Sequence, residues 1–302
     1  MKTGYSLAKT AFLILLPSAL LVSSCKKSSS SSATGASSSN SDAASLSESS
    51  AASDNAFDDA FNVAVQTNQD HSLNNIILHA GGTQTNGMGG STGLGAFYCA
   101  SVSVTPLDTV NYPKQIVVDF GSGCTSLDGI TRSGSITYNL SKRFRNPGAT
   151  ISATFTNYVV NGYKLGGTYT ITNNSSLTNG IQYTTAVTGG SVTNPNDSSY
   201  TFSGTKTVTQ TAGIGSLDFS TYVFSVTGNY MLANSWGQSL TANITTPLVK
   251  QESCKHIVSG VVSFVYTKGT TTLNGTFDYG SGACDSLAAI KIGTYTKSVT
   301  LP

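Results

Sequence analysis

The sequence has few charged residues and few of the side chains that usually carry catalysis or bind metals. Only 10% of its 302 residues are charged, the formal net charge is +2, and there are three histidines and one tryptophan. A nucleic-acid-binding protein needs a basic stripe that follows the phosphate backbone, and this sequence has none. His71, His79 and His256 also lack the spacing of metal ligands. We therefore expect no nucleic-acid partner, no metal site and, since cofactor loops are absent, no cofactor.

Recognisable catalytic motifs are also missing. Calcium takes about six to eight oxygen ligands, and the aspartates near the cysteines do not form a spaced acidic loop of that kind. Residues 89–93 read GGSTG, which formally matches the G-x-S-x-G pattern of serine hydrolases. That pattern needs a strand before it and a helix after it, whereas both flanks here are rich in glycine. We therefore predict no catalytic residues.

The amino terminus has the pattern of an export signal. A basic start is followed by the apolar run TAFLILLPSALLV (10–22) and by small residues before Cys25. This order is typical of a secretory signal peptide. The ending LVSSC (21–25) is similar to the bacterial lipobox, in which the cysteine is lipidated and becomes the mature amino terminus. We predict a lipoprotein signal peptide at 1–24 and lipid attachment at Cys25, with an ordinary signal peptide as the alternative.

The segment that follows is predicted to be a flexible linker. Residues 25–53 contain no aromatic residue and one large apolar residue, Leu46. Such a composition buries too little surface to offset the entropy of ordering the chain. More than one acyl chain at Cys25 would bind a bilayer durably, because each buried methylene contributes about 0.8 kcal/mol. We therefore expect a folded part tethered to a membrane of the bacterial cell envelope, with the outer membrane as the expected location.

Residues 54–95 are predicted to form a short helix and a glycine-rich loop. In 54–70 apolar side chains recur at three- and four-residue spacing, and Asp54 suits a helix start. Residues 81–95 are rich in Gly, Thr and Ser, which indicates a loop.

Residues 96–302 are predicted to form an all-β domain. Thr, Val, Tyr, Ser and Ile alternate there in runs that Gly, Asn and Pro interrupt, a pattern typical of antiparallel strands joined by hairpins. We count about 13 such runs, and Asn161-Gly162 is a strong hairpin turn. Open twisted sheets rarely exceed about ten strands. We therefore expect the antiparallel meander, preceded by one short N-terminal helix, to fold as a sandwich or a partly closed barrel.

Two similar phrases predict how the cysteines pair. VVDFGSGC (117–124) and TFDYGSGAC (276–284) each end in a cysteine, and each follows a cysteine that opens a strand. Pairing is the default in an exported protein. A strand that leaves the first cysteine and returns through a hairpin brings the second within disulfide reach. We predict the disulfides Cys99–Cys124 and Cys254–Cys284, with the aspartate of each phrase facing outward or capping the following turn.

Three stretches carry a family resemblance. They are SVTPLDTVNYPKQIVVDFGSGCTSLDGITRSGSI, ITTPLVKQESCKHIVSGVV and LNGTFDYGSGACDSLAAI. Together they resemble a family of all-β lipoproteins from Bacteroidota that has no assigned activity. The resemblance covers the lipobox, the aspartate-rich helix and nearly all of the β region. It implies a location and an anchor, and no reaction.

Two surface features are candidates for contact with other molecules. Lys142-Arg143-Phe144-Arg145 is interpreted as a solvated hairpin tip, with contact to an anionic glycan or lipid headgroup as the alternative. Trp236 falls at a hairpin turn, where we expect the ring to fold over the sheet edge; an exposed ring would instead stack on a sugar.

The sequence therefore predicts an envelope lipoprotein that acts as a membrane-tethered, non-catalytic β module and binds a glycan, a protein or an envelope component. Two alternatives stay open. One is an envelope hydrolase without a recognisable motif, and the other is a carrier of a lipid or small apolar molecule. A carrier would need a hollow apolar interior.

Overall fold

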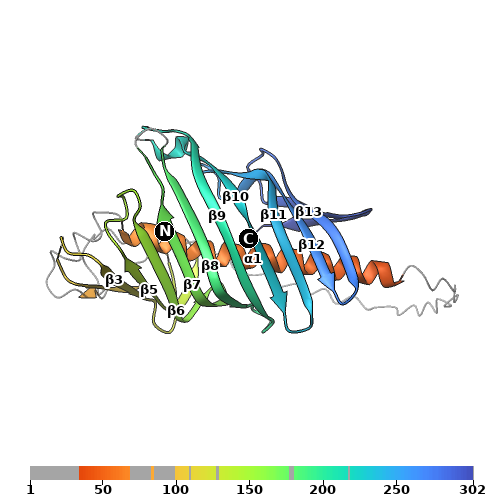
Figure 1. Cartoon of the computed structure of the whole chain (residues 1–302), viewed down its shortest axis with the longest axis horizontal. Coiled ribbons are helices and arrows are strands. Elements are labelled where there is room, and N and C mark those ends of the chain that lie inside the picture. The colour runs from red at the N-terminus through yellow and green to blue at the C-terminus, as the bar shows by residue number, and fades with distance from the viewer. Residues whose placement is uncertain are drawn as a thin grey trace, which may run out of the picture.

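The computed structural model shows one long helix followed by an antiparallel meander (Figure 1). The predicted signal peptide, Cys25 and most of the predicted glycine-rich loop lie outside the residues that the structure describes. The described residues are 34–68, 83–84, 99–108, 110–126, 129–176, 180–216 and 218–301.

The helix α1 spans Thr34–Asn68. The strands follow in chain order, with a 3-10 turn η2 (Phe219–Thr221) before the tenth. They are β1 (Thr83–Gln84), β2 (Ser101–Thr105), β3 (Lys114–Asp119), β4 (Cys124–Thr125), β5 (Thr131–Leu140), β6 (Thr150–Val160), β7 (Tyr163–Asn173), β8 (Gln182–Thr193), β9 (Ser199–Ala212), β10 (Val223–Asn234), β11 (Gln238–Gln251), β12 (Ile257–Lys268), β13 (Thr271–Ser281), β14 (Leu287–Ile292) and β15 (Tyr295–Thr300).

The strands form a single antiparallel sheet in which neighbours in sequence are neighbours in space. The sheet has 15 strands in the order β1-β2-β3-β5 and then consecutively to β15, while the short β4 pairs with β5 off this path. The predicted all-β antiparallel meander behind one helix is confirmed. Among the described residues, β1 and β15 stand at opposite ends of this order and do not pair, so the sheet is not closed into a barrel.

One face of the sheet is apolar and the other polar. On β5, Ile136, Tyr138 and Leu140 are buried, whereas Thr137 and Asn139 alternate with them on the other face. This two-residue period is expected for an antiparallel sheet that is covered on one side and solvated on the other.

Glycine bulges bend the strands. Gly134 lies where the register between β5 and β6 shifts, and it has a φ of +70°. A Cβ atom there would overlap the backbone carbonyl oxygen of Asn157. Only glycine therefore fits this bulge, which lets the sheet curve locally.

The helix is longer than the sequence predicts, and the flexible linker predicted over 25–53 is wrong from Thr34 onward. Residues 34–53 are the first half of α1, and Ala43, Ala44 and Leu46 are buried in the main core. Small alanine side chains let the helix lie close to the sheet, so this segment packs with Leu46 as its one large apolar residue. The hydroxyl of Ser53 is also buried, but it donates to the Ser49 carbonyl at 2.7 Å, so its burial leaves no unpaired donor.

The helix supplies the second layer that the meander needs. Figure 1 shows α1 running across the strands along one face of the sheet, and a helix of 35 residues is about 50 Å long. It contacts β6, β7, β10, β11, β13, β14 and β15. This explains how a sheet of more than about ten strands stays open, because the helix covers the face against which a second sheet would otherwise pack.

Among the described residues, no helix combines the length and the hydropathy that crossing a membrane requires.

Candidate functional site

The interface between α1 and the sheet contains a buried ionic network centred on Asp59. Its Oδ2 accepts hydrogen bonds from Arg132 Nε at 2.9 Å and from the Tyr158 hydroxyl at 2.5 Å, and its Oδ1 accepts one from Arg132 Nη2 at 2.5 Å. Asp59 is 4% exposed and Arg132 is 1% exposed. A buried ion pair needs this kind of bidentate geometry with an additional donor to offset the loss of water. The arrangement holds the helix on β5 and β6.

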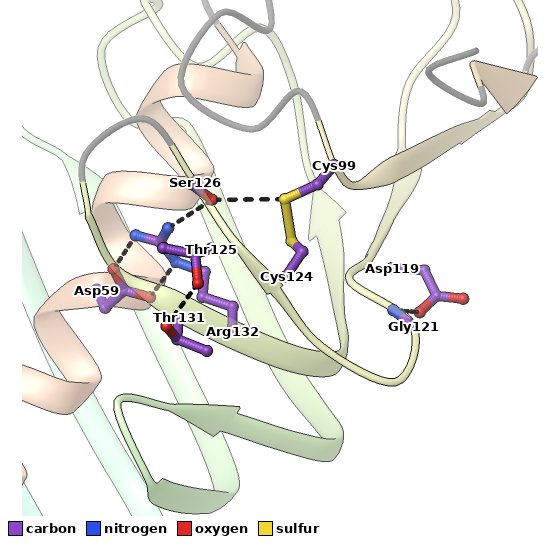
Figure 2. Close-up of a disulfide and its surroundings, with 9 residues drawn as sticks. All are labelled: Asp59, Cys99, Asp119, Gly121, Cys124, Thr125, Ser126, Thr131 and Arg132. Atoms are coloured by element: carbon purple, nitrogen blue, oxygen red, sulfur yellow. Dashed lines mark hydrogen bonds and ion pairs between the residues drawn. A yellow bond between two sulfur atoms is a disulfide. The ribbon is translucent and has the colours of Figure 1, made fainter.

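The Asp59 network continues to the first disulfide. Arg132 Nη1 donates to Ser126 Oγ at 3.1 Å, and Ser126 Oγ lies 4.0 Å from the Cys99 sulfur (Figure 2). The Arg132 guanidinium also lies 5.8 Å from the centroid of the buried Phe120 ring. The phrase VVDFGSGC is therefore connected to α1 through Arg132.

Both predicted disulfides are present. The Cα atoms are 5.9 Å apart in Cys99–Cys124 and 5.7 Å apart in Cys254–Cys284. The second cysteine of each pair lies beyond the end of the return strand, because β3 ends at Asp119 and β13 at Ser281. Cys124 opens the short strand β4, whereas Cys99, Cys254 and Cys284 lie in the segments between strands.

The two phrases have the same local geometry. Asp119 Oδ1 accepts the backbone N–H of Gly121 at 2.8 Å, as Figure 2 shows, and Asp278 Oδ1 accepts that of Gly280 at 3.0 Å. Each aspartate thus caps the turn that follows it, which is one of the two predicted roles. The repeated phrase serves turn formation and disulfide placement.

Removing either disulfide is expected to lower the free energy of unfolding by about 2–4 kcal/mol, because each one closes a long loop in the unfolded chain. The sequence separations are 25 and 30 residues. The double variants Cys99→Ser/Cys124→Ser and Cys254→Ser/Cys284→Ser can be compared by urea denaturation. A change well below about 1 kcal/mol in both would show that the cross-links do not constrain the unfolded state.

A second ionic cluster joins the middle of α1 to β9. Lys206 Nζ lies 2.9 Å from Asp54 Oδ1 and 2.6 Å from Asp58 Oδ1, and Lys206 is buried. Burial lowers the pKa of Lys206, but the charges of Asp54 and Asp58 outweigh it, so the pKa is raised well above its usual value. This lysine therefore stays charged beneath the helix.

Asp58 titrates differently from an ordinary surface carboxyl. Burial raises the pKa of Asp58 to about 6, with the Lys206 charge opposing the rise and the Asp54 charge adding to it. A raised folded-state pKa means that stability falls as the pH rises from about 4 to about 6. The Asp58 side chain is nevertheless 43% exposed, so solvent screens these charges and we expect only a small change in stability.

The space beside the Lys206 cluster is too small for a substrate. The cavity there has a volume of about 10 Å³ and is lined by residues that include Phe57, Tyr169 and Tyr230. That volume holds one water molecule at most. Among the described residues, no group of three or more His, Cys, Asp or Glu side chains is placed to hold a metal ion. The charges of Lys206, Asp54 and Asp58 are therefore paired, and the cavity beside them does not hold a substrate.

Of the other residues that the sequence singled out, His256 lies at the connection before β12 and is partly buried. Burial and the nearby Lys255 charge lower the pKa of His256. His71, His79 and the GGSTG stretch lie outside the described residues.

Trp236 and the basic cluster are both on the surface. The Trp236 side chain is 67% exposed, so the expectation that its ring folds over the sheet edge is wrong. The reason is local: Asn234 Oδ1 accepts the backbone N–H groups of Trp236 and Gln238, each at 3.1 Å, which fixes the turn with the ring outward. Lys142, Arg143 and Arg145 are exposed, as predicted for a solvated hairpin tip.

Sequence reasoning missed the ionic contacts of α1, although a signal for them exists. Arg132 and Lys206 occupy inward positions in the two-residue alternation of their strands. A basic residue on the apolar face of a strand needs a buried acidic partner. In the structure, aspartates of α1 supply these partners.

Comparison of the chain with protein-family models, with curated proteins and with solved structures found no match.

Proposed function

We propose that the chain is a lipid-anchored, non-catalytic β module of the bacterial cell envelope that binds an envelope glycan at the β10–β11 hairpin. The packed contact between α1 and the sheet supports a binding module over a carrier, because a carrier needs an interior hollow enough for its cargo. The pairing of the buried charges supports a non-catalytic role. Binding then takes place on the outer surface of the sheet and its edges.

The tether rests on the lipobox-like sequence before Cys25. Replacing Cys25 with alanine is expected to abolish acyl labelling, because the thiol that carries the lipid is gone. The neighbouring Ser24→Ala variant keeps a small residue before the cysteine and serves as the control. Unchanged acyl labelling of Cys25→Ala would rule the tether out.

The observation that carries the glycan proposal is the exposed Trp236 ring on a stiff hairpin. An aromatic face held in water at a fixed turn is well suited to an apolar sugar face, and ordering it costs little further entropy. Polar side chains cover the sheet face that continues from this hairpin, such as Ser239, Thr241 and Asn243 on β11. They would offer hydrogen bonds to sugar hydroxyls.

The proposal has a direct test because Trp236 is the single tryptophan of the chain. Titration with soluble peptidoglycan fragments is expected to shift the tryptophan emission to the blue as the ring leaves water. Trp236→Ala should weaken binding by at least about tenfold, as for a central aromatic contact. Leu287→Ala, at an exposed residue of the opposite sheet edge, is the matched control. No emission shift, together with equal binding by both variants, would overturn the glycan proposal.

A further inference from the structure

Two neighbouring connections at one edge of the sheet expose apolar and basic side chains. Lys114 at the start of β3 pairs with Leu140 at the end of β5, so the β2–β3 connection lies beside the β5–β6 connection. The first exposes Leu107 (42%) and Val110 (78%). The second exposes three cations. We call the following set the basic–apolar edge: Leu107, Val110, Lys142, Arg143 and Arg145.

The β2–β3 connection is held in shape from within. The buried Lys114 donates from Nζ to the carbonyl oxygens of Pro106 at 2.9 Å and of Asp108 at 2.5 Å. Asp108 Oδ1 accepts the backbone N–H groups of Val110 at 2.9 Å and of Asn111 at 2.6 Å. Hydrogen bonds from Asn111 and Val110 lower the pKa of Asp108, so this cap stays ionised. These hydrogen bonds fix the turn with the apolar Val110 side chain 78% exposed.

The β5–β6 connection is anchored in a similar way. Phe144 is buried and stacks on Tyr183 at 5.2 Å between ring centroids, and Asn173 Nδ2 donates to the Phe144 carbonyl at 2.6 Å. This anchor leaves Lys142, Arg143 and Arg145 on the outside. The connection, residues 141–149, contains no Asp or Glu. It therefore presents a local positive charge on a chain whose net charge is only +2.

We propose that the basic–apolar edge docks on the surface of an anionic lipid bilayer. Val110 and Leu107 enter the boundary between headgroups and acyl chains, and the three basic side chains contact anionic headgroups. Both terms contribute to binding at a membrane surface. A soluble anionic glycan matches the charge but offers no apolar phase for Val110. The contact does not depend on lipidation of Cys25.

This docking sets the orientation of the domain. Connections of an antiparallel meander alternate between the two edges of the sheet, and the β10–β11 hairpin falls on the edge opposite to the β2–β3 and β5–β6 connections. Trp236 therefore faces away from the bilayer when the basic–apolar edge is bound.

Vesicle flotation with the chain that begins at residue 26 tests the proposal, because it carries neither the predicted signal peptide nor an acyl chain and all variants share one background. We expect stronger binding to vesicles of phosphatidylglycerol and phosphatidylcholine than to phosphatidylcholine alone. Lys142→Gln/Arg143→Gln/Arg145→Gln should weaken the former by roughly 100-fold, since each basic residue at an anionic surface contributes roughly fivefold. The matched control, Lys164→Gln/Lys268→Gln/Lys297→Gln, removes equal charge elsewhere and should change binding far less. Equal losses in the two triple variants would overturn the proposal.

A fluorophore sensitive to polarity, attached at Val110→Cys, distinguishes the bilayer from other partners. Its emission should shift to the blue with the anionic vesicles, whereas the same label at Trp236→Cys should not change. A label at residue 110 that stays in water while the protein binds a soluble sulfated dextran would assign the cations to an anionic glycan and overturn the bilayer proposal. Circular dichroism of each variant confirms that it folds.

Discussion

Replacing Phe57 with alanine is expected to destabilise the protein by about 3–5 kcal/mol, the usual cost of removing a buried aromatic side chain. Phe57 is 1% exposed, and its ring centroid lies 5.2 Å from that of Phe202, 5.8 Å from that of Phe155 and 6.2 Å from that of Tyr169. These three rings come from β9, β6 and β7. One helix residue therefore joins strands that do not all pair with each other, and its loss leaves a cavity that the sheet cannot close.

Urea denaturation measures this effect. The control is Asn55→Ala, an exposed position two residues earlier on the same helix, which should change the free energy of unfolding by no more than about 0.5 kcal/mol. If Phe57→Ala costs as little as Asn55→Ala, then α1 is not packed on the sheet as described.

Replacing Arg132 with methionine is expected to cost about 3–5 kcal/mol, because it leaves the Asp59 carboxylate buried without its counter-charge. Tyr158 would be the remaining side-chain donor to that carboxylate. The double variant Asp59→Leu/Arg132→Met removes both charges and should recover much of the loss, since an apolar pair of similar volume often substitutes well for a buried ion pair.

The matched control is Lys268→Met, which breaks the ion pair between Lys268 Nζ and Asp42 Oδ2 at 2.8 Å. Both partners are more than a third exposed, so the expected loss is below about 1 kcal/mol. Equal destabilisation by Arg132→Met and Lys268→Met would contradict the role assigned to the buried network. A double variant no more stable than Arg132→Met would contradict the argument that the unpaired Asp59 carboxylate causes the loss of stability.

The strands and the cysteine pairs follow from local sequence patterns. The alternation of apolar and polar residues around Ile136, Tyr138 and Leu140 indicates a strand by itself, because one face of an antiparallel strand is buried and the other is solvated. The disulfides were predictable because each repeated phrase contains a turn followed by a cysteine, and the turn places that cysteine near its partner.

The first half of α1 was not predictable in the same way. Its serine- and alanine-rich sequence has the composition of a linker, and the segment is ordered through tertiary contacts of Ala43, Ala44 and Leu46 with the rest of the core. Helical stability in proteins comes mostly from such packing. The open sheet was not predictable for the same reason, because the number of strands does not reveal that a helix supplies the second layer.

The ionic contacts were half predictable. Strand alternation places Arg132 and Lys206 on the inner face, which implies acidic partners beneath them. The identity of those partners depends on where α1 crosses the sheet, and nothing local in the sequence encodes that crossing. The exposure of Trp236 depends likewise on one side chain, Asn234, that fixes the turn.

The most direct test of the fold that underlies these proposals is amide hydrogen exchange over residues 40–53. If this half of α1 is an integral layer of the domain, its amides should be protected to nearly the same extent as those of β5 to β9, because they open only when the domain unfolds. If this segment instead exchanges as fast as an unstructured peptide and protection begins near Asp54, the flexible linker predicted from the sequence is correct. That result would contradict the packing of the first half of α1 on the sheet.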